Sequence, residues 1–311
     1  MNKRARHLFA AALAAILVGV LSVGALAGEK KFLVGYATSA DTDVYVQRLK
    51  ETFGAFAAKD PSMEVVYSDA GGDNNRQLDQ IDNFLIQGVD AIVVVPVDYA
   101  GVTAGVEKAN EAGIPVIALC IEAEGGKVTF VGSANRESGE MQGAFIRKNL
   151  KKGGKVVHLG GYPGYYHTIQ RREGFLAESV EKRPDIVLLA EQPGNYDRDK
   201  GMLVMEDWIQ SFPEIDAVVA ANDQMALGAI EALKAADRID NVLVCGVDGL
   251  EEALDAIEEG HMSYTVLQNA EAQAETCYKT LKDILAGKPA PERVIVPFEP
   301  ITRDNYAKYR K

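Results

Sequence analysis

Short apolar segments that alternate with longer amphipathic segments constrain the fold of this chain more than any other feature. From Lys31 onward the apolar segments are nearly continuous in Val, Ile and Leu, with little alternation of polarity. Strands of that composition are buried on both faces, as in parallel sheets. We expect strands at residues 32–37, 63–69, 91–97, 115–120 and 128–133, and again at 156–160, 186–192, 217–221, 242–247 and 262–268.

The segments between these strands have the spacing of helices. Residues 43–59 place Val46, Leu49 and Phe53 on one helical face, and Gly88 and Gly113 stand where two further helices would end. The result is two successive strand–helix arrays, which predicts an α/β fold of two doubly wound parallel-sheet lobes. The expected helices are residues 43–59, 73–87, 100–112, 135–150, 169–181, 197–211, 225–235, 250–259 and 271–286.

The first 27 residues differ from the rest of the chain. Basic residues at 3, 4 and 6 precede an apolar run over residues 8–26, and Ala25-Leu26-Ala27 has the pattern of a cleavage site. This layout predicts a secretory signal peptide over residues 1–27, cleaved after Ala27, and therefore a periplasmic protein. The alternative is an uncleaved membrane anchor, because the apolar run is long enough to span a bilayer. The polar residues at 28–31 favour cleavage.

The charge and the cysteines exclude some classes of protein. The chain has 33 basic and 45 acidic residues, a net charge of −12, and a surface of that sign repels phosphate backbones. We therefore expect no nucleic-acid partner. Cys120 and Cys245 lie in strand-like segments and Cys277 in a helical one, so buried free thiols are expected, although an oxidising compartment would also permit a disulfide.

Polar and aromatic side chains gather where the expected strands end, from Asp43 after the first strand to Gln268 after the last. In open α/β sheets, ligands bind beyond the carboxyl ends of the strands. Carboxylates and amides suit hydroxyl-rich ligands, and aromatic faces suit the C–H faces of a sugar ring. The competing interpretation is that each polar residue only caps the next helix, which we favour for Asp69, Asp98 and Asp223 taken singly.

Other chemistries find little support in the sequence. The glycine-rich residues 160–164 follow a strand but match neither a dinucleotide fingerprint nor a phosphate-binding loop. No two histidines have the spacing of a metal pair, and no serine lies in a nucleophile elbow. His158 and Trp208 are expected in the core. We therefore expect no metal, no cofactor and no enzymatic activity.

Five segments carry a resemblance to a known family. They are NDQMALG at 222–228, GVDG at 246–249, QPGNYD at 192–197, AGIPVI at 112–117 and RREGF at 171–175. In this order they resemble the ribose-binding branch of periplasmic sugar-binding proteins, over essentially the whole chain after the signal segment. The resemblance implies two lobes of the type I periplasmic binding fold, joined by crossing segments near residues 133–135, 266–269 and 294–298. The N-terminal lobe would comprise residues 28–133 and 269–296, and the C-terminal lobe residues 134–268 and 297–311.

The resemblance also implies a set of ligand contacts, with two departures. Asn222, Asp248 and Gln268 match the family's polar contacts, Tyr45 and Tyr196 its stacking positions, and Asp43 a polar contact after the first strand. Where ribose-binding proteins carry an Asp-Arg pair, this chain has Cys120 and Ile121. A further family arginine falls on Ile169 without gaps, and a small shift would place Arg171 or His167 there. The predicted ligand-binding residues are Asp43, Tyr45, Cys120, Tyr165, His167, Arg171, Tyr196, Asn222, Asp248 and Gln268.

The function implied by this resemblance is capture of a small molecule between the lobes. We expect a periplasmic solute-binding protein that delivers a sugar or polyol to the membrane permease of an ABC transporter. Loss of charged donors points away from ribose, towards a polyol, a cyclitol or another monosaccharide. The alternatives are a sensory receptor that presents its ligand to a chemoreceptor or a sensor kinase, and a binder of a non-sugar molecule. The ligand's identity and affinity are not determined by the sequence.

Overall fold

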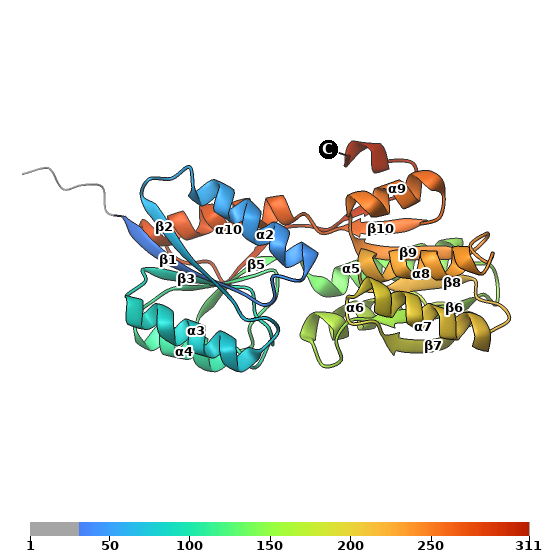
Figure 1. Ribbon diagram of the computed structural model, residues 1–311, viewed down its shortest axis with the longest axis horizontal. Coiled ribbons are helices and arrows are strands. Elements are labelled where there is room, and N and C mark those ends of the chain that lie inside the picture. The colour runs from blue at the N-terminus through green and yellow to red at the C-terminus, as the bar shows by residue number, and fades with distance from the viewer. Residues whose placement is uncertain (1–30, 311) are drawn as a thin grey trace, which may run out of the picture.

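The computed structural model describes residues 31–310, which form two α/β lobes along the long axis of the molecule (Figure 1). Each lobe is built on one six-stranded sheet, with the strand order β11-β5-β4-β3-β1-β2 in the first and β12-β10-β9-β8-β6-β7 in the second. The first sheet consists of β1 (Phe32–Thr38), β2 (Met63–Asp69), β3 (Ala91–Val94), β4 (Val116–Leu119), β5 (Val128–Gly132) and β11 (Arg293–Ile295). The second consists of β6 (Lys155–Gly160), β7 (Val187–Pro193), β8 (Ala217–Ala220), β9 (Leu243–Asp248), β10 (Tyr264–Leu267) and β12 (Glu299–Ile301).

Helices cover both faces of each sheet. In the first lobe, α2 (Val44–Ala57) and α10 (Ala270–Leu285) pack on one face, while α3 (Asn74–Gln87) and α4 (Thr103–Glu111) cover the other. In the second lobe, α5 (Asn135–Asn149) and α6 (Tyr166–Glu178) cover one face. The opposite face carries α7 (Arg198–Ser211), α8 (Asp223–Ala235) and α9 (Glu251–Glu259). Four apolar clusters result, one on each face of each sheet, which explains why the strands are continuously apolar.

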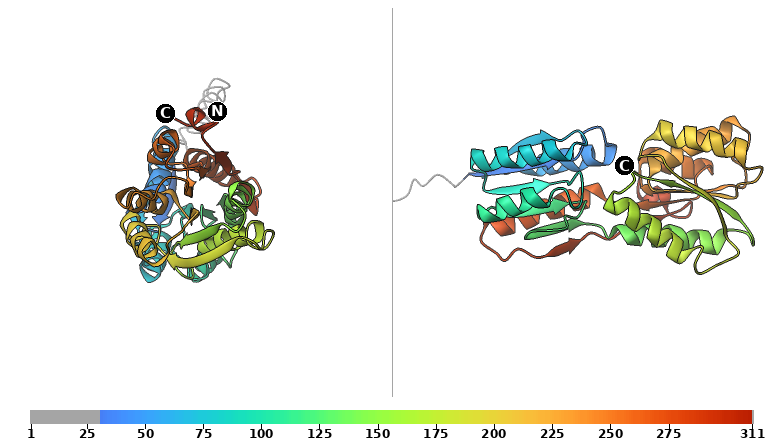
Figure 2. Two further views of the ribbon diagram at one scale, coloured as in Figure 1. Left: turned by 90° about the vertical axis from the view of Figure 1, so that its right-hand side faces the viewer. Right: turned by 90° about the horizontal axis from the view of Figure 1, so that it is seen from below.

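The chain passes between the sheets three times. It leaves the first sheet after β5, returns after β10, and crosses again between β11 and β12. Seen from below, the dark-red segment around β11 runs from the first lobe towards the second (Figure 2). The lobe boundaries predicted at residues 133, 268 and 296 fall in these three connections; as a domain division they stay a prediction.

The strand pairs explain how both lobes present the same edge to each other. The strand pairs given by the structure are parallel, except that β12 pairs antiparallel with β10. Parallel strands end together, so the polar residues that follow them are collected at one edge of each sheet. The fold class expected from the sequence is confirmed.

Some elements differ from their expected bounds. The helix expected to begin at residue 169 begins at Tyr166. Its start was misplaced because no capping side chain marks it in the sequence. Strands β11 and β12 were not expected, and each has only three residues. Gly88 ends α3 in the left-handed conformation with φ 71°, as expected. Within residues 31–310, no helix combines the length and the apolar character that crossing a bilayer requires. The predicted signal peptide lies outside the described residues.

The buried residues singled out in the sequence lie where they were expected. Cys120, Cys245 and Cys277 are buried free thiols. Trp208 is 2% exposed in the core beside α8, and His158 is 3% exposed within β6. His158 stacks on Phe175 with ring centroids 5.4 Å apart, which confirms a structural role for this histidine.

Candidate ligand-binding cleft

Two connected chambers lie where the strands of both lobes end. The inner chamber, of about 50 Å³, is lined by residues of both lobes and of one connection between them. The outer chamber, of about 210 Å³, adjoins it and shares five of its lining residues. The shared residues are Asp43, Tyr45, Tyr196, Asn222 and Asp248. Cys120, Asn135, His167, Arg171 and Gln268 belong to the inner chamber, and Asp197, Arg198 and Asp199 to the outer one.

Nine of the ten predicted ligand-binding residues line the inner chamber. Tyr165 does not: it immediately precedes α6, and its ring lies 5.2 Å from that of Tyr162. The ungapped placement of a family arginine on Ile169 is wrong, because Ile169 is 42% exposed, whereas Arg171 is 6% exposed and faces the chamber. The two residues are two positions apart on α6, which places their side chains about 200° apart around the helix axis. The sequence alone did not determine which of the two side chains faces the cleft.

Asn135, Val46 and Ile121 also line the inner chamber. Asn135 was not predicted, although it follows the carboxyl end of β5 and opens α5. Like Asp43, Asn222 and Gln268, it follows the carboxyl end of a strand within a few residues. A search for every amide or carboxylate within three residues of a strand end would have found it.

Arg171 is the centre of the polar network in the inner chamber. Its Nε donates to Oδ1 of Asn135 at 3.2 Å, and its Nη1 donates to the carbonyl of Ala221 at 2.6 Å. Its Nη2 donates to Oε1 of Gln268 at 2.6 Å. Because all three acceptors are neutral, the guanidinium is held rigidly without being neutralised by an ion pair.

Gln268 connects the two lobes through this network. It lies in the connection between β10 and α10 and is 3% exposed. Its Oε1 accepts from Arg171 of the second lobe, and its Nε2 donates to Sγ of Cys120 of the first lobe at 3.2 Å. Burial raises the pKa of the Cys120 thiol to about 12, so this sulfur remains a neutral acceptor.

Two aromatic rings form one wall of the chamber. His167 and Tyr196 lie with ring centroids 5.2 Å apart and an interplanar angle of 20°. The Tyr196 hydroxyl is hydrogen-bonded to Oγ1 of Thr168 at 2.8 Å, which fixes the ring. A side chain at Gly161 would collide with Tyr196, since its Cβ would stand 2.1 Å from that ring. The wall offers a flat face to the C–H groups of a ligand.

Two buried polar atoms of this cleft make no hydrogen bond within residues 31–310. The Tyr45 hydroxyl and Nδ1 of His167 are buried and have no hydrogen-bond partner among the described residues. Burial lowers the pKa of His167 to about 3, so its imidazole is neutral at pH 7. Both groups are available to a ligand, and a bound hydroxyl or amine would remove the cost of leaving them unpaired.

Backbone strain concentrates at the cleft. Among the described residues, six other than glycine have a positive φ, and four of them are Cys120 (68°), Asn195 (54°), Tyr196 (58°) and Asp248 (127°). Such conformations favour glycine and cost on the order of 1–3 kcal/mol each. Strain of this kind, held by surrounding structure, is typical of positions whose side chains have a function.

Some of the polar residues at strand ends cap the following helix, but they are not all the ones that the sequence indicated. Asp43 caps α2 by accepting from the backbone N–H groups of Tyr45 at 2.8 Å and Val46 at 3.0 Å. Asn222 caps α8 by accepting from Met225 at 3.0 Å. The expectation that Asp223 caps its own helix is wrong. It is fully buried and accepts instead from the backbone of Gly249 and Leu250 and from Thr265, anchoring the start of α9.

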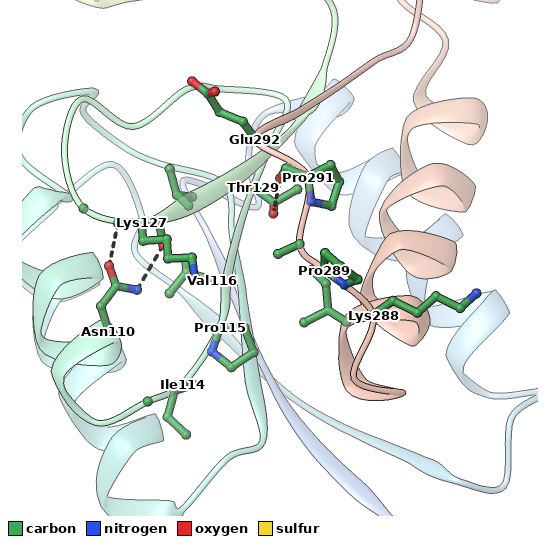
Figure 3. Close-up of a pocket in the computed structure, with 15 residues that line it drawn as sticks. Asn110, Ile114, Pro115, Val116, Lys127, Thr129, Lys288, Pro289, Pro291 and Glu292 are labelled. Atoms are coloured by element: carbon green, nitrogen blue, oxygen red, sulfur yellow. Dashed lines mark hydrogen bonds between the residues drawn. The ribbon is translucent and has the colours of Figure 1, made fainter.

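A larger cavity, of about 640 Å³, lies at the opposite edge of the first sheet (Figure 3). It is bordered by the starts of β4 and β5 and by the chain after α10. Its polar groups already have partners: Asn110 bonds the backbone of Lys127, and Thr129 donates to the carbonyl of Pro291 at 2.6 Å. Because few of its polar groups are free to meet a ligand, the smaller cleft is the stronger candidate for the binding site.

Comparison with known proteins places the chain in a family. A family model described as periplasmic binding protein domain matches residues 34–289. The ribose import binding protein RbsB of Bacillus subtilis (strain 168) is 36% identical over 272 residues, covering 87% of each chain. The xylitol-binding protein of Mycolicibacterium smegmatis is 33% identical over 272 residues, covering 86% of this chain and 76% of its own.

Solved structures agree with this assignment. An ABC transporter solute-binding protein from Bacillus halodurans C-125, determined with bound myo-inositol, matches with a TM-score of 0.86 at 34% identity. The match covers 91% of this chain and 98% of that one. The family model spans most of the chain and the relatives cover both lobes. The chain therefore belongs to the periplasmic binding protein family, whose members bind solutes rather than catalyse reactions.

Proposed function

We propose that this protein captures one small sugar or polyol in the cleft and delivers it to the permease of an ABC transporter. The observation that carries the proposal is the buried polar network of Arg171, Asn135 and Gln268, which faces a chamber beside an aromatic wall. Donors and acceptors next to a flat apolar face match a polyhydroxylated ligand. The relatives support this class, since two are named for ribose and xylitol and the third was determined with bound myo-inositol.

The binding mechanism is closure of the lobes around the ligand. Asp43 and Tyr45 reach the chamber from the first lobe, and Arg171 and Asp248 reach it from the second. A ligand that contacts both sets stabilises the closed state more than the open state, and this difference shifts the population. The permease then distinguishes the closed form.

The lining favours a polyol or cyclitol over ribose. Cys120 and Ile121 contribute a neutral thiol and an apolar side chain to the floor of the chamber, and neither donates a charged hydrogen bond. A ligand that presents an apolar edge to these two residues loses no affinity. A ligand whose hydroxyl groups require two hydrogen bonds from one charged side chain is bound more weakly.

The site of action is the periplasm, after removal of residues 1–27 by cleavage after Ala27. The family assignment and the basic and apolar layout of residues 1–27 support this location. N-terminal sequencing of the protein recovered from the periplasmic fraction tests the cleavage site. A mature chain beginning at any residue other than Gly28 would contradict it.

The decisive experiment identifies the ligand directly. Protein purified without added solutes is denatured, and the released small molecules are identified by mass spectrometry. The refolded protein is then titrated calorimetrically with ribose, xylitol, myo-inositol and the recovered compound. Saturable one-to-one binding of a polyhydroxylated compound is expected, and its absence for all of them would contradict the proposed function. Co-purification with a permease, and not with a chemoreceptor or sensor kinase, separates transport from a sensory role.

A further inference from the structure

We propose that the ligand carries a protonated amino group, so that it is an amino sugar or amino polyol, and that Asp43 and Asp248 hold this group. The proposal rests on the proposed function, since it specifies the class of polyhydroxylated ligand. The two aspartates come from opposite lobes and line both chambers, so they lie where the two chambers adjoin. A cation placed there would contact both lobes at once.

The Asp248 carboxylate faces the cleft without a partner. It is 7% exposed, lines both chambers, and makes no side-chain hydrogen bond or ion pair with any residue in 31–310. Its backbone is held at φ 127°, a conformation that favours glycine, so the fold maintains this side chain in an unfavourable position. Burial raises the pKa of Asp248 well above its usual value, because the nearby positive charge of Arg171 only partly offsets the loss of water.

Asp43 also has a carboxylate oxygen that is free to accept a hydrogen bond from a ligand. Its Oδ1 accepts from the backbone of Tyr45 and Val46, and its Oδ2 has no partner among the described residues. Among the described residues of the first lobe, no basic side chain lines either chamber. Burial raises the pKa of Asp43 as well, although its two backbone hydrogen bonds oppose that shift.

The arginines that line the chambers form no ion pair with Asp43 or Asp248. Arg171 uses its donors on three neutral acceptors and forms no ion pair with Asp43 or Asp248. In the outer chamber, Arg198 pairs with Glu231 at 2.7 Å and with Glu252. His167 is neutral, as its lowered pKa shows. Arg48 lies outside the lining of both chambers, and its effect on the pKa of Asp248 is smaller than that of Arg171.

Counted as formal charges, the lining of the two chambers is negative, because four aspartates stand against two arginines. Asp223, buried behind Asp248, is bonded to backbone N–H groups and a hydroxyl and not to a cation, and it raises the pKa of Asp248 further. Asp197 and Asp199 add two more carboxylates to the outer chamber. A ligand with hydroxyl groups alone would satisfy the hydrogen bonds. An ammonium group would satisfy them too, and would also stabilise the ionised forms of Asp43 and Asp248, which burial disfavours.

A metal ion is a poorer match to this arrangement. Among residues 31–310, no three His, Cys, Asp or Glu side chains converge as a metal site requires. The charge is also set beside a wall of aromatic rings and neutral amides, which suits an organic ring or chain. The cation expected here is therefore part of the ligand.

The test compares ligand pairs that differ in one hydroxyl and one amino group. D-glucose is paired with D-glucosamine, D-galactose with D-galactosamine, D-glucitol with 1-amino-1-deoxy-D-glucitol, and myo-inositol with an aminodeoxyinositol. Each is titrated calorimetrically at pH 7 into refolded protein. In at least one pair the amine should bind about tenfold or more tightly, because charge-assisted hydrogen bonds are roughly twice as strong as neutral ones.

Two isosteric variants assign the preference to its residues. Asp248→Asn and Asp43→Asn remove one charge each, and asparagine at position 43 retains the cap of α2. Each variant should reduce the amine-to-hydroxyl affinity ratio about tenfold. Asp73→Asn is the matched control, because Asp73 caps α3 and lines neither chamber, and its ratio should be unchanged. Thermal unfolding of each variant confirms that it is folded.

The possible results separate this proposal from the function on which it rests. If neutral members bind and no amine binds more tightly than its partner, the amino group is wrong and the proposed function stands. If an amine preference persists in both variants, its assignment to Asp43 and Asp248 is wrong. If neither class binds, and the ligand released from the protein is not polyhydroxylated, the proposed function itself is overturned.

Discussion

At the residue scale, Asn222 combines two roles that must be separated in any mutational test. Its Oδ1 accepts from Met225 and caps α8, and its Nδ2 donates to the carbonyl of Tyr196 at 3.3 Å beside the chamber. Asn222→Ala should lower the free energy of unfolding by about 1 kcal/mol through loss of the cap, and should weaken ligand binding. Asn222→Ser, a capping residue with a shorter side chain, should recover the stability but not the binding. Urea unfolding and calorimetry measure the two effects; equal binding by Ala and Ser variants and wild type would contradict the contact role.

His167 gives a prediction about pH. Its pKa is lowered by burial to about 3 in the folded protein, against about 6.5 in the unfolded chain. Between these values only the unfolded chain binds the proton, so the ligand-free protein loses stability as pH falls, by at most about 1.4 kcal/mol per pH unit from this group. Unfolding of wild type and His167→Gln at pH 7 and pH 5 should show a smaller loss in the variant. Equal losses would mean that His167 can protonate in the folded state.

The sequence predicted most of the cleft lining because of one physical rule. Parallel strands end at one edge, so residues such as Asp43, Asn222 and Asp248 had to come together there. The rotation of α6 was not predictable in the same way. Arg171 and Ile169 differ by two positions on a helix, which turns one into the cleft and the other to the surface, and only tertiary packing decides which.

At the element scale, the contact between α5 and α6 determines where Arg171 lies. A Cβ at Gly139 would stand 1.9 Å from the carbonyl of Arg171, and one at Gly174 would stand 2.2 Å from the carbonyl of Arg136. The two glycines therefore permit the backbones of these helices to approach closely. Gly139 was not singled out in the sequence, and Gly174 was named only within the RREGF segment, since a glycine within a helix has no periodic signature that reveals its neighbour.

Gly139→Ala should consequently act on the site from a distance. Separating the helices by a methyl group should lower the stability by roughly 1–3 kcal/mol, and moving α6 should weaken ligand binding. Gly105→Ala is the control, because the three atoms nearest its Cβ would be side-chain atoms of Ile81 and Leu78 in the other lobe, and none would be backbone. We expect the control to bind ligand normally. Unaltered calorimetric affinity in a destabilised Gly139→Ala protein would contradict the coupling.

The short strands show the limit of sequence patterns at this scale. The longer strands and the helices were predictable because their periodicity extends over many residues. Strands β11 and β12 have three residues each and exist because β5 and β10 offer them a free edge. Their sequence, with exposed residues such as Arg293 and Glu299, does not distinguish them from a connection.

At the scale of the whole molecule, the lobes also touch outside the chambers. Tyr99 follows β3 in the first lobe, and Tyr166 opens α6 in the second. Their rings stack with centroids 4.1 Å apart and an interplanar angle of 12°. Neither residue lines a chamber, so the stack stabilises closure without contacting the ligand. No sequence pattern could have paired two tyrosines from different lobes.

Tyr166→Ala should therefore weaken ligand binding by removing this contact from the closed state only. An aromatic pair contributes about 0.5–1.5 kcal/mol, so the affinity should fall about two- to tenfold, mainly through faster dissociation. Tyr99→Ala should have the same effect, and the double variant should be no weaker than either single one, because the second substitution has no stack left to remove. Calorimetry and stopped-flow dissociation measure these values. Additive losses in the double variant would show that the two tyrosines act independently and that the closed state does not depend on their stacking.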